Sequence, residues 1–159
     1  MFEKRQQLYI ATENGTVEEM CRSILSQITE DNLLKIVFFN SPACDAEYLQ
    51  NYDTFHATVK KHFTHNTPLV SYVAQEPIGY LLAAEVTTLT KECNTIERHE
   101  HHILLKSNNC TEIIIGGIIP KDITRSTFEQ STDIFVKISD ILHSNGFEAN
   151  HICRQWNYI

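Results

Sequence analysis

The sequence predicts an α+β domain in which helices cover one face of a mostly antiparallel sheet. Three observations lead to this prediction. Amphipathic helical patterns alternate with short apolar runs of strand length. Two of the helical patterns begin with a capping box, at Thr16 to Glu19 and at Ser126 to Glu129. Each is followed by a strand pattern, so a helix-then-strand segment occurs twice, about 110 residues apart, which is the length of one small domain.

The residue pattern in the first part of the chain predicts a strand, a helix and a second strand. Residues 7–12 form the strand, and Asn14-Gly15 ends it. From residue 17 to residue 28 the apolar side chains recur at the i, i+3, i+4 and i+7 spacing of an amphipathic helix. Residues 33–40 (LLKIVFFN) are a nearly continuous apolar run, which is typical of a buried strand.

The middle of the chain predicts a second helix and two further strands. The helix begins at Asp45, its apolar stripe runs to Phe63, and Asn66-Thr67-Pro68 ends it. The strands cover residues 69–74 and 80–89, and residues 76–79 (EPIG) between them are turn formers. The short connection predicts that these two strands form a hairpin.

The last part of the chain begins with a polar segment of mixed charge, residues 90–102, which predicts a linker or an exposed loop. Two strands are expected at residues 103–105 and 111–115. The capping box at Ser126 then begins a third helix, and residues 149–159 predict a final strand.

These patterns divide the chain into one complete unit and part of a second. The complete unit spans residues 1–90, a linker or loop spans 91–102, and the first half of a second unit spans 103–159. The last predicted strand has no helix after it, so it would lack a covering layer. We therefore expect the chain to be the N-terminal fragment of a longer protein.

Composition and charge exclude several classes of protein. The chain has 159 residues and a net charge of −7, which disfavours nucleic-acid and anionic-membrane partners, because phosphate binding needs clustered cations. No apolar run is long enough to span a membrane, and the N-terminus lacks the apolar core of a signal peptide. The five cysteines form no C-x-x-C pair, as is typical of free thiols in a reducing compartment. We expect a cytoplasmic protein with no cofactor.

Several motifs, taken in order, resemble one known family. The LLKIVFFN strand is followed by a helix with Tyr52 and Phe55, by Pro68 before the next strand, and by a last strand that holds Glu85. Residues 116–120 (GGIIP) resemble an S-G-x-x-P exit from a strand. Together these features resemble the YjgF/RidA superfamily, also described as endoribonuclease L-PSP-like. The resemblance implies a RidA- or chorismate-mutase-like fold and a trimeric assembly.

The end of the chain carries a further resemblance. Arg154-Gln155-Trp156-Asn157-Tyr158 resembles the R-x-W-N-Y strand in the RidA-like halves of chorismatases. In a strand, Arg154, Trp156 and Tyr158 share one face, where they either line a ligand pocket or pack in a core or interface. These three residues and Gly117, from the strand exit, are the candidate ligand-binding residues.

The resemblance also implies a candidate catalytic residue. RidA enzymes hydrolyse enamines and imines, with an Arg that grips the substrate carboxylate and a Glu on the last strand that orients water. Glu85 matches this Glu. The position that matches the Arg is Val70, which cannot bind a carboxylate. If Arg98 or Arg154 lies beside Glu85, it can take the place of the missing Arg.

Histidines and one cysteine are weaker candidates. His99, His101 and His102 can ligate a metal, but no cysteine or distant histidine at zinc spacing completes a site, so no metal is predicted. Cys44 precedes a helix start, which lowers a thiol pKa, yet no base is evident beside it. The histidines of the second predicted helix are interpreted as surface residues: His56, His62 and His65.

Three hypotheses for function follow. The first is a noncatalytic RidA-like N-terminal module that supports assembly or binds a small metabolite. The second is an enzyme, either an enamine or imine deaminase or part of a chorismatase-like hydrolase. The third is a protein-interaction module. The expected partners are other copies of the chain in a trimer, or a C-terminal region beyond this sequence.

Overall fold

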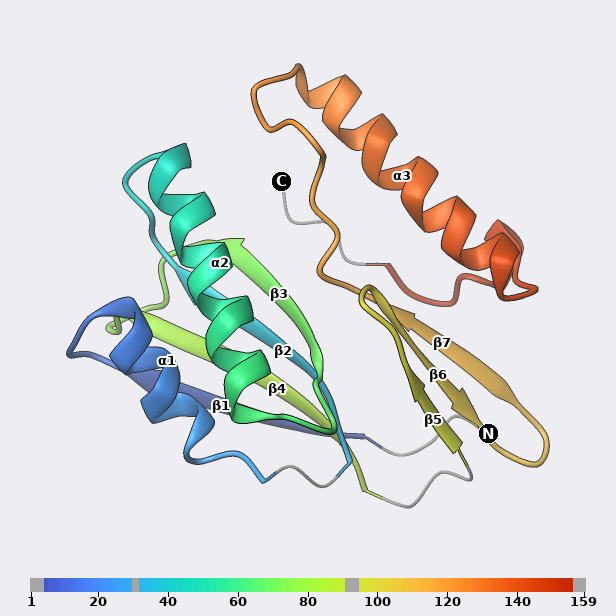
Figure 1. Cartoon of the computed structure of the whole chain (residues 1–159), viewed down its shortest axis with the longest axis horizontal. Helices are drawn as coiled ribbons and strands as arrows, with labels where there is room; N and C mark the ends of the chain where they lie inside the picture. The colour runs from blue at the N-terminus through green and yellow to red at the C-terminus, as the bar shows by residue number, and fades with distance from the viewer. Residues whose placement is uncertain (1–4, 30–31, 91–94, 156–159) are drawn as a thin grey trace. The chain divides into compact units, whose positions relative to one another are not determined.

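The computed structural model describes residues 5–29, 32–90 and 95–155, which form a mixed arrangement of helices and strands (Figure 1). The chain divides into two compact units, residues 1–117 and residues 118–159. The α+β class predicted from the sequence is confirmed.

The first unit contains two sheets. The order along the chain is β1 (Arg5–Thr12), α1 (Val17–Leu25), β2 (Leu33–Asn40), α2 (Asp45–His62), β3 (Leu69–Ala74), β4 (Leu82–Leu89), β5 (Thr95–Arg98), β6 (His102–Lys106) and β7 (Thr111–Ile115). The larger sheet has the order β1-β4-β2-β3, and the smaller sheet has the order β5-β6-β7. Only β2 and β3 run parallel in the larger sheet, and α2 is the crossover between them.

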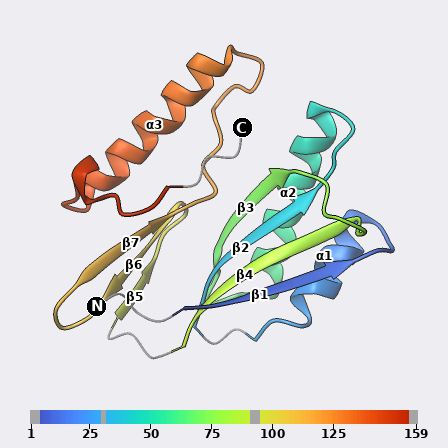
Figure 2. The same ribbon diagram turned by 180° about the vertical axis from the view of Figure 1, so that it is seen from behind.

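Helices α1 and α2 cover one face of the larger sheet (Figures 1 and 2). Their apolar stripes pack on the strand residues that point to that face, among them Ile36, Phe38 and Ala84. The rings of Phe38 and Phe55 stack with their centroids 4.4 Å apart, and both side chains are fully buried. This face holds the larger of the two hydrophobic clusters, as the predicted helix-on-sheet arrangement requires.

The smaller sheet contributes to a second hydrophobic cluster in the same unit. Leu34, Leu69 and Leu89 of the larger sheet pack with Ile103 and Leu105 of β6. The two sheets are also joined by an ion pair between Arg5 and Glu112 and by the hydrogen bond from Gly117 N to Ser71 Oγ. The smaller sheet therefore belongs to the fold of the first unit.

The second unit contains α3 (Thr127–Ser144) and a short 3₁₀ helix, η1 (Ala149–His151). In α3, Leu142 is the one buried residue, while Phe128, Phe135 and Val136 are exposed. The described part of this unit contains no strand.

Both predicted capping boxes are confirmed. Thr16 Oγ1 accepts a hydrogen bond from Glu19 N, and the Glu19 carboxylate accepts one from Thr16 N. Ser126 and Glu129 make the same reciprocal pair at the start of α3. Each box satisfies two amides that a helix start would otherwise leave unpaired, so the motif fixes the first residue of each helix.

The predicted hairpin between residues 69–74 and 80–89 is wrong. Strand β4 does not pair with β3; it lies between β1 and β2 and is antiparallel to both. The central position suits β4 because five of its eight residues are buried. The connection after β3 therefore passes over β2 rather than making a tight turn.

Two further expectations differ from the structure. Thr95–Arg98, inside the segment expected to be a linker or loop, is strand β5, because its backbone pairs with β6 despite its polar composition. The final strand predicted at residues 149–159 is wrong for its described part, since Ala149–His151 is a 3₁₀ helix and residues 152–155 have no regular structure. Short apolar and aromatic runs do not by themselves distinguish a strand from an irregular segment.

Candidate functional site

Glu85 lies on the face of the larger sheet that is opposite α1 and α2. Its neighbours in β4, Ala84 and Val86, point into the helix-side core, so Glu85 points away from it. The strand register places Glu85 in one cross-strand row with Tyr9, Val37 and Ser71. The candidate catalytic residue is therefore in the middle of a sheet face that no helix among the described residues of the first unit covers.

The Glu85 carboxylate has two polar neighbours. Gln7 Nε2 donates a hydrogen bond of 3.2 Å to Glu85 Oε1, and Lys35 Nζ lies 3.8 Å from the same oxygen. The side chains of Lys35 and Glu85 are 24% and 19% exposed, so the ion pair is only partly hydrated. In such surroundings a charge interacts more strongly with its partner, or with a ligand, than it would in bulk water.

Lys35 is the basic residue beside Glu85, and sequence reasoning missed it in favour of Arg98 or Arg154. A signal was present, because Lys35 is the single charged residue in the apolar run LLKIVFFN. A lone charge in a buried strand usually has a partner on a neighbouring strand. The register offers this partner, since Lys35 is opposite Thr87, two residues from Glu85.

Gly117 approaches the larger sheet from the end of β7. Its amide donates to Ser71 Oγ at 3.1 Å, and its carbonyl accepts from the Tyr52 hydroxyl at 3.4 Å. Ser71 belongs to the row of Glu85 and is two strands away from it, which corresponds to roughly 10 Å. Gly117 thus lies beside β3, two strands away from Glu85.

The backbone at Gly117 requires glycine. Its φ is +67°, and a Cβ atom built there would lie 2.3 Å from the carbonyl oxygen of Val70. The close approach lets the chain turn along the outer edge of β3. Val70 itself is 5% exposed and packs in the helix-side core, so the position that resembles the substrate-binding Arg is not on the Glu85 face.

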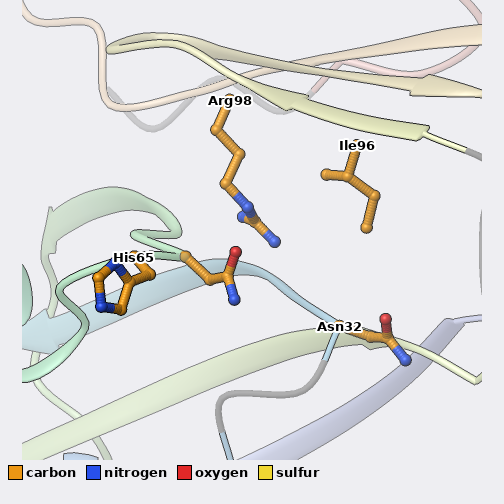
Figure 3. Close-up of a pocket in the computed structure, with 5 residues that line it drawn as sticks. Asn32, His65, Ile96 and Arg98 are labelled. Atoms are coloured by element: carbon orange, nitrogen blue, oxygen red, sulfur yellow. The ribbon is translucent and has the colours of Figure 1, made fainter.

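Arg98 occupies a different place, a pocket of about 270 Å³ (Figure 3). Its guanidinium donates to the Leu33 carbonyl at 2.7 Å and to the Thr67 carbonyl at 3.4 Å. The side chains of Arg98 and Ile96 point from β5 into the pocket, with His65 and Asn32 on the other side. The hydrogen bonds of Arg98 join β5 to the starts of β2 and β3.

His56, which sequence reasoning took for a surface histidine, is half-buried, and its Nε2 atom is shielded from water. Its Nε2 atom has no hydrogen-bond partner among the described residues, and its ring lies 4.2 Å from the ring of Tyr52. Burial lowers the pKa of His56, and the nearby His101 lowers it further. His56 lies near the Gly117 turn, where its Cε1 atom would be 3.9 Å from a Cβ atom built on Gly117.

The other histidines form no metal centre in the described part of the chain. The rings of His99 and His102 stack 4.2 Å apart, and His65 lies beyond the end of α2. No group of three His, Cys, Asp or Glu side chains that could hold a metal ion occurs among residues 5–29, 32–90 and 95–155.

The three candidates at the C-terminal end are not joined to this site. Arg154 lies in the second unit, in a segment without regular structure. Trp156 and Tyr158 lie outside the described residues. Their assignment as ligand-binding residues stays a prediction, and the strand that would align them on one face is absent in its described part, 149–155.

The chain is similar to several solved structures but has no match among family models or curated sequences. One similar solved structure is a Salmonella typhimurium protein described as a candidate translation initiation inhibitor, with 15% identity over 54% of this chain and 82% of that chain and a TM-score of 0.43. Another is yeast Mmf1, with 21% identity over 54% of this chain and 80% of that chain and a TM-score of 0.39.

These neighbours are YjgF/RidA-family proteins. With TM-scores below 0.5, the similarities assign neither membership of that family nor an activity to this chain. Among the described residues, no helix is both long and apolar enough to cross a membrane.

Proposed function

We propose that this chain is a RidA-like module that binds a small metabolite on the sheet face of Glu85 and does not itself catalyse a reaction. The observation that supports the proposal best is the Lys35–Glu85 pair. It places a cation and an anion side by side on partly buried strands. The resemblance of the sequence motifs to the YjgF/RidA superfamily gives the proposal its family context.

The ligand class follows from these charges. The Lys35 ammonium can donate to a carboxylate, and the Glu85 carboxylate can accept from an ammonium or imino group. Gln7 adds an amide beside the same carboxylate. A small zwitterion such as an α-amino acid matches both charges at once, because each of its ends would replace one half of the ion pair.

The noncatalytic assignment rests on what is beside Glu85. The position that resembles the carboxylate-gripping Arg is Val70, which is buried on the other face of the sheet. Lys35 is a point charge on a flexible stem, so it cannot hold a carboxylate in the fixed bidentate geometry of a guanidinium. Glu85 is already engaged by Gln7 and Lys35.

The binding test uses the proteinogenic α-amino acids as probes in calorimetry with the full chain. The corresponding 2-oxo acids and amines, which each lack one charge, serve as ligand controls. Lys35→Met and Glu85→Gln should each abolish binding. Lys106→Met should not, because Lys106 makes the same kind of ion pair with Glu97 on the smaller sheet. Binding that survives both site substitutions, or no binding by any probe, would contradict the proposal.

The enzyme alternative has one observation in its favour, which is that Lys35 supplies a cation beside Glu85. It is tested by offering the chain an imine generated from an amino acid. Turnover that Glu85→Ala abolishes would replace the noncatalytic proposal with an imine deaminase. The cytoplasmic location implied by the sequence stays a prediction, as does a chorismatase-like partner region. The trimer implied by the resemblance is the alternative to the dimer proposed below, and the mass of the assembly in solution distinguishes the two.

A further inference from the structure

Strand β1 forms one outer edge of the larger sheet. It pairs with β4 on one side, and no strand of the described chain pairs with its other side (Figures 1 and 2). An edge strand presents a row of backbone amides and carbonyls to any chain that approaches it. The side chains of this edge strand therefore determine whether it can pair with a strand of another chain.

The side chains of β1 do not protect the edge. The strand is eight residues long (RQQLYIAT) and contains no proline, no glycine and no lysine. It pairs with β4 in unbroken register over all eight residues, so it has no bulge. Leu8 is 44% exposed and Tyr9 is 69% exposed, an unusual state for apolar residues in the middle of a strand. Natural proteins normally block such an edge with charges, bulges or short strands.

We propose that β1 pairs antiparallel with β1 of a second copy of this chain, about a twofold axis at Tyr9. In this register Tyr9 is opposite Tyr9 of the partner subunit, and Leu8 is opposite Ile10 of the partner subunit. The pairing joins two four-stranded sheets into one continuous sheet. It also covers Leu8 and Tyr9, the two exposed apolar side chains of β1.

Charge complementarity selects this register. With the axis at Tyr9, Arg5 is opposite Glu13 of the partner subunit, and this occurs twice because of the symmetry. Axes at Gln7, Leu8 or Ile10 would instead place Arg5 opposite a tyrosine, an alanine or a glycine. Arg5 also forms an ion pair with Glu112 of its own chain, so the added pair extends an existing charge cluster.

The helices agree with the same register. With the axis at Tyr9, even-numbered residues are opposite even-numbered residues and odd-numbered residues are opposite odd-numbered residues. The helix-side residues of both copies therefore stay on one face of the joined sheet. The opposite face then carries Glu85 of each copy in one row with Tyr9 and Tyr9 of the partner subunit, since Tyr9 is opposite Glu85. The dimer would thus join the two Glu85 faces into a single surface.

The first test measures the mass of the full chain by sedimentation equilibrium. We expect a concentration-dependent dimer. Tyr9→Asp places two like charges opposite each other on the axis and should weaken the dimer at least about tenfold. Tyr80→Asp is the matched control, because Tyr80 is also an exposed tyrosine, 44% exposed, but lies outside β1. A monomer or a trimer in place of the dimer, or equal weakening by both substitutions, would overturn the proposal.

The second test does not depend on the stability of the aspartate variant. Cys44, Cys93, Cys110 and Cys153 are replaced by serine, and Cys21 is kept because it is fully buried. Across the axis, opposed Cβ atoms lie about 5 Å apart, so Tyr9→Cys should form an intermolecular disulfide on mild oxidation. Gln7→Cys should not, because its copies would be about 13 Å apart along the strands. A crosslink at residue 7 that is as efficient as at residue 9 would rule out the register.

Discussion

The two faces of the larger sheet differ in what their side chains do. The helix-side face is filled by apolar side chains that are almost wholly excluded from water, such as Phe38 and Ile36. The opposite face carries Glu85, Lys35 and Gln7 on neighbouring strands, where water still reaches them. The helix-side face therefore supplies the larger share of the free energy of folding, and the part of the opposite face around Glu85 is available for binding. Substitutions on the two faces should separate stability from ligand affinity.

The largest loss of stability is expected from Phe38→Ala. Phe38 is fully buried and stacks on Phe55, so truncation leaves a cavity in the helix-side core. The free energy of unfolding, measured by urea denaturation, should fall by about 3–5 kcal/mol. The control is Phe39→Ala, the next residue of β2, which points to the opposite face and is only half-buried. Equal losses at the two positions would contradict the difference between the faces.

A smaller loss is expected from Gly117→Ala, at the turn beside the polar face. The new Cβ atom would need a left-handed backbone and would lie 2.3 Å from Val70 O, so the turn must move. Gly79→Ala is the control, because Gly79 also has a positive φ but no atom within 4 Å of a built Cβ. We expect about 1–2 kcal/mol at Gly79 and at least about 1 kcal/mol more at Gly117. Similar losses would show that the contact with Val70 relaxes freely.

The third prediction concerns pH and His56, on the Gly117 side of α2. Burial lowers its pKa below the ordinary value of 6.5, with His101 opposing protonation and Asp53 and Glu100 favouring it. Between the folded and unfolded pKa values the unfolded chain binds more protons, so stability falls as the pH falls from about 6.5 through the folded pKa. Urea midpoints at pH 7.5 and pH 5 should show this loss.

His56→Gln should flatten that pH dependence, because glutamine takes up no proton. His62→Gln, at an exposed position near the end of the same helix, is the matched control and should keep the dependence of the parent chain. An unchanged slope after His56→Gln would assign the pH dependence to other groups.

Local chemistry explains which parts of the fold the sequence predicts. Capping boxes depend on residues three apart, so both were found together with the starts of α1 and α3. The hairpin prediction was wrong because it relied on the turn before β4. The partners of β4 are instead determined by the burial of that strand between β1 and β2. Strand β5 was missed for the same reason. Its polar side chains do not predict a strand, and it is one because its backbone pairs with β6.

The residues of the candidate site could also be named from the sequence, whereas their positions relative to one another depend on strand pairing. Glu85 and Gly117 were named through resemblance, and the structure places them two strands apart by a register that no single segment encodes. Lys35 was visible as a lone charge in an apolar strand, but its partner could be named only after β4 was placed beside β2. The sequence argument against substrate binding at Val70 was that its side chain cannot bind a carboxylate, and the structure places that side chain in the helix-side core.

The smallest effect on stability is expected at the ion pair itself. Lys35→Met and Glu85→Gln each remove one charge from a pair that is about a fifth to a quarter exposed, so the free energy of unfolding should change by about 1 kcal/mol or less. The double variant should be closer to the parent chain than either single variant, because it leaves no unpaired charge. Both single variants should nevertheless lose amino-acid binding in calorimetry. If either single variant instead lowered the free energy of unfolding as much as Phe38→Ala, the ion pair would be part of the structural core. The proposal that the polar face is a binding site would then be wrong.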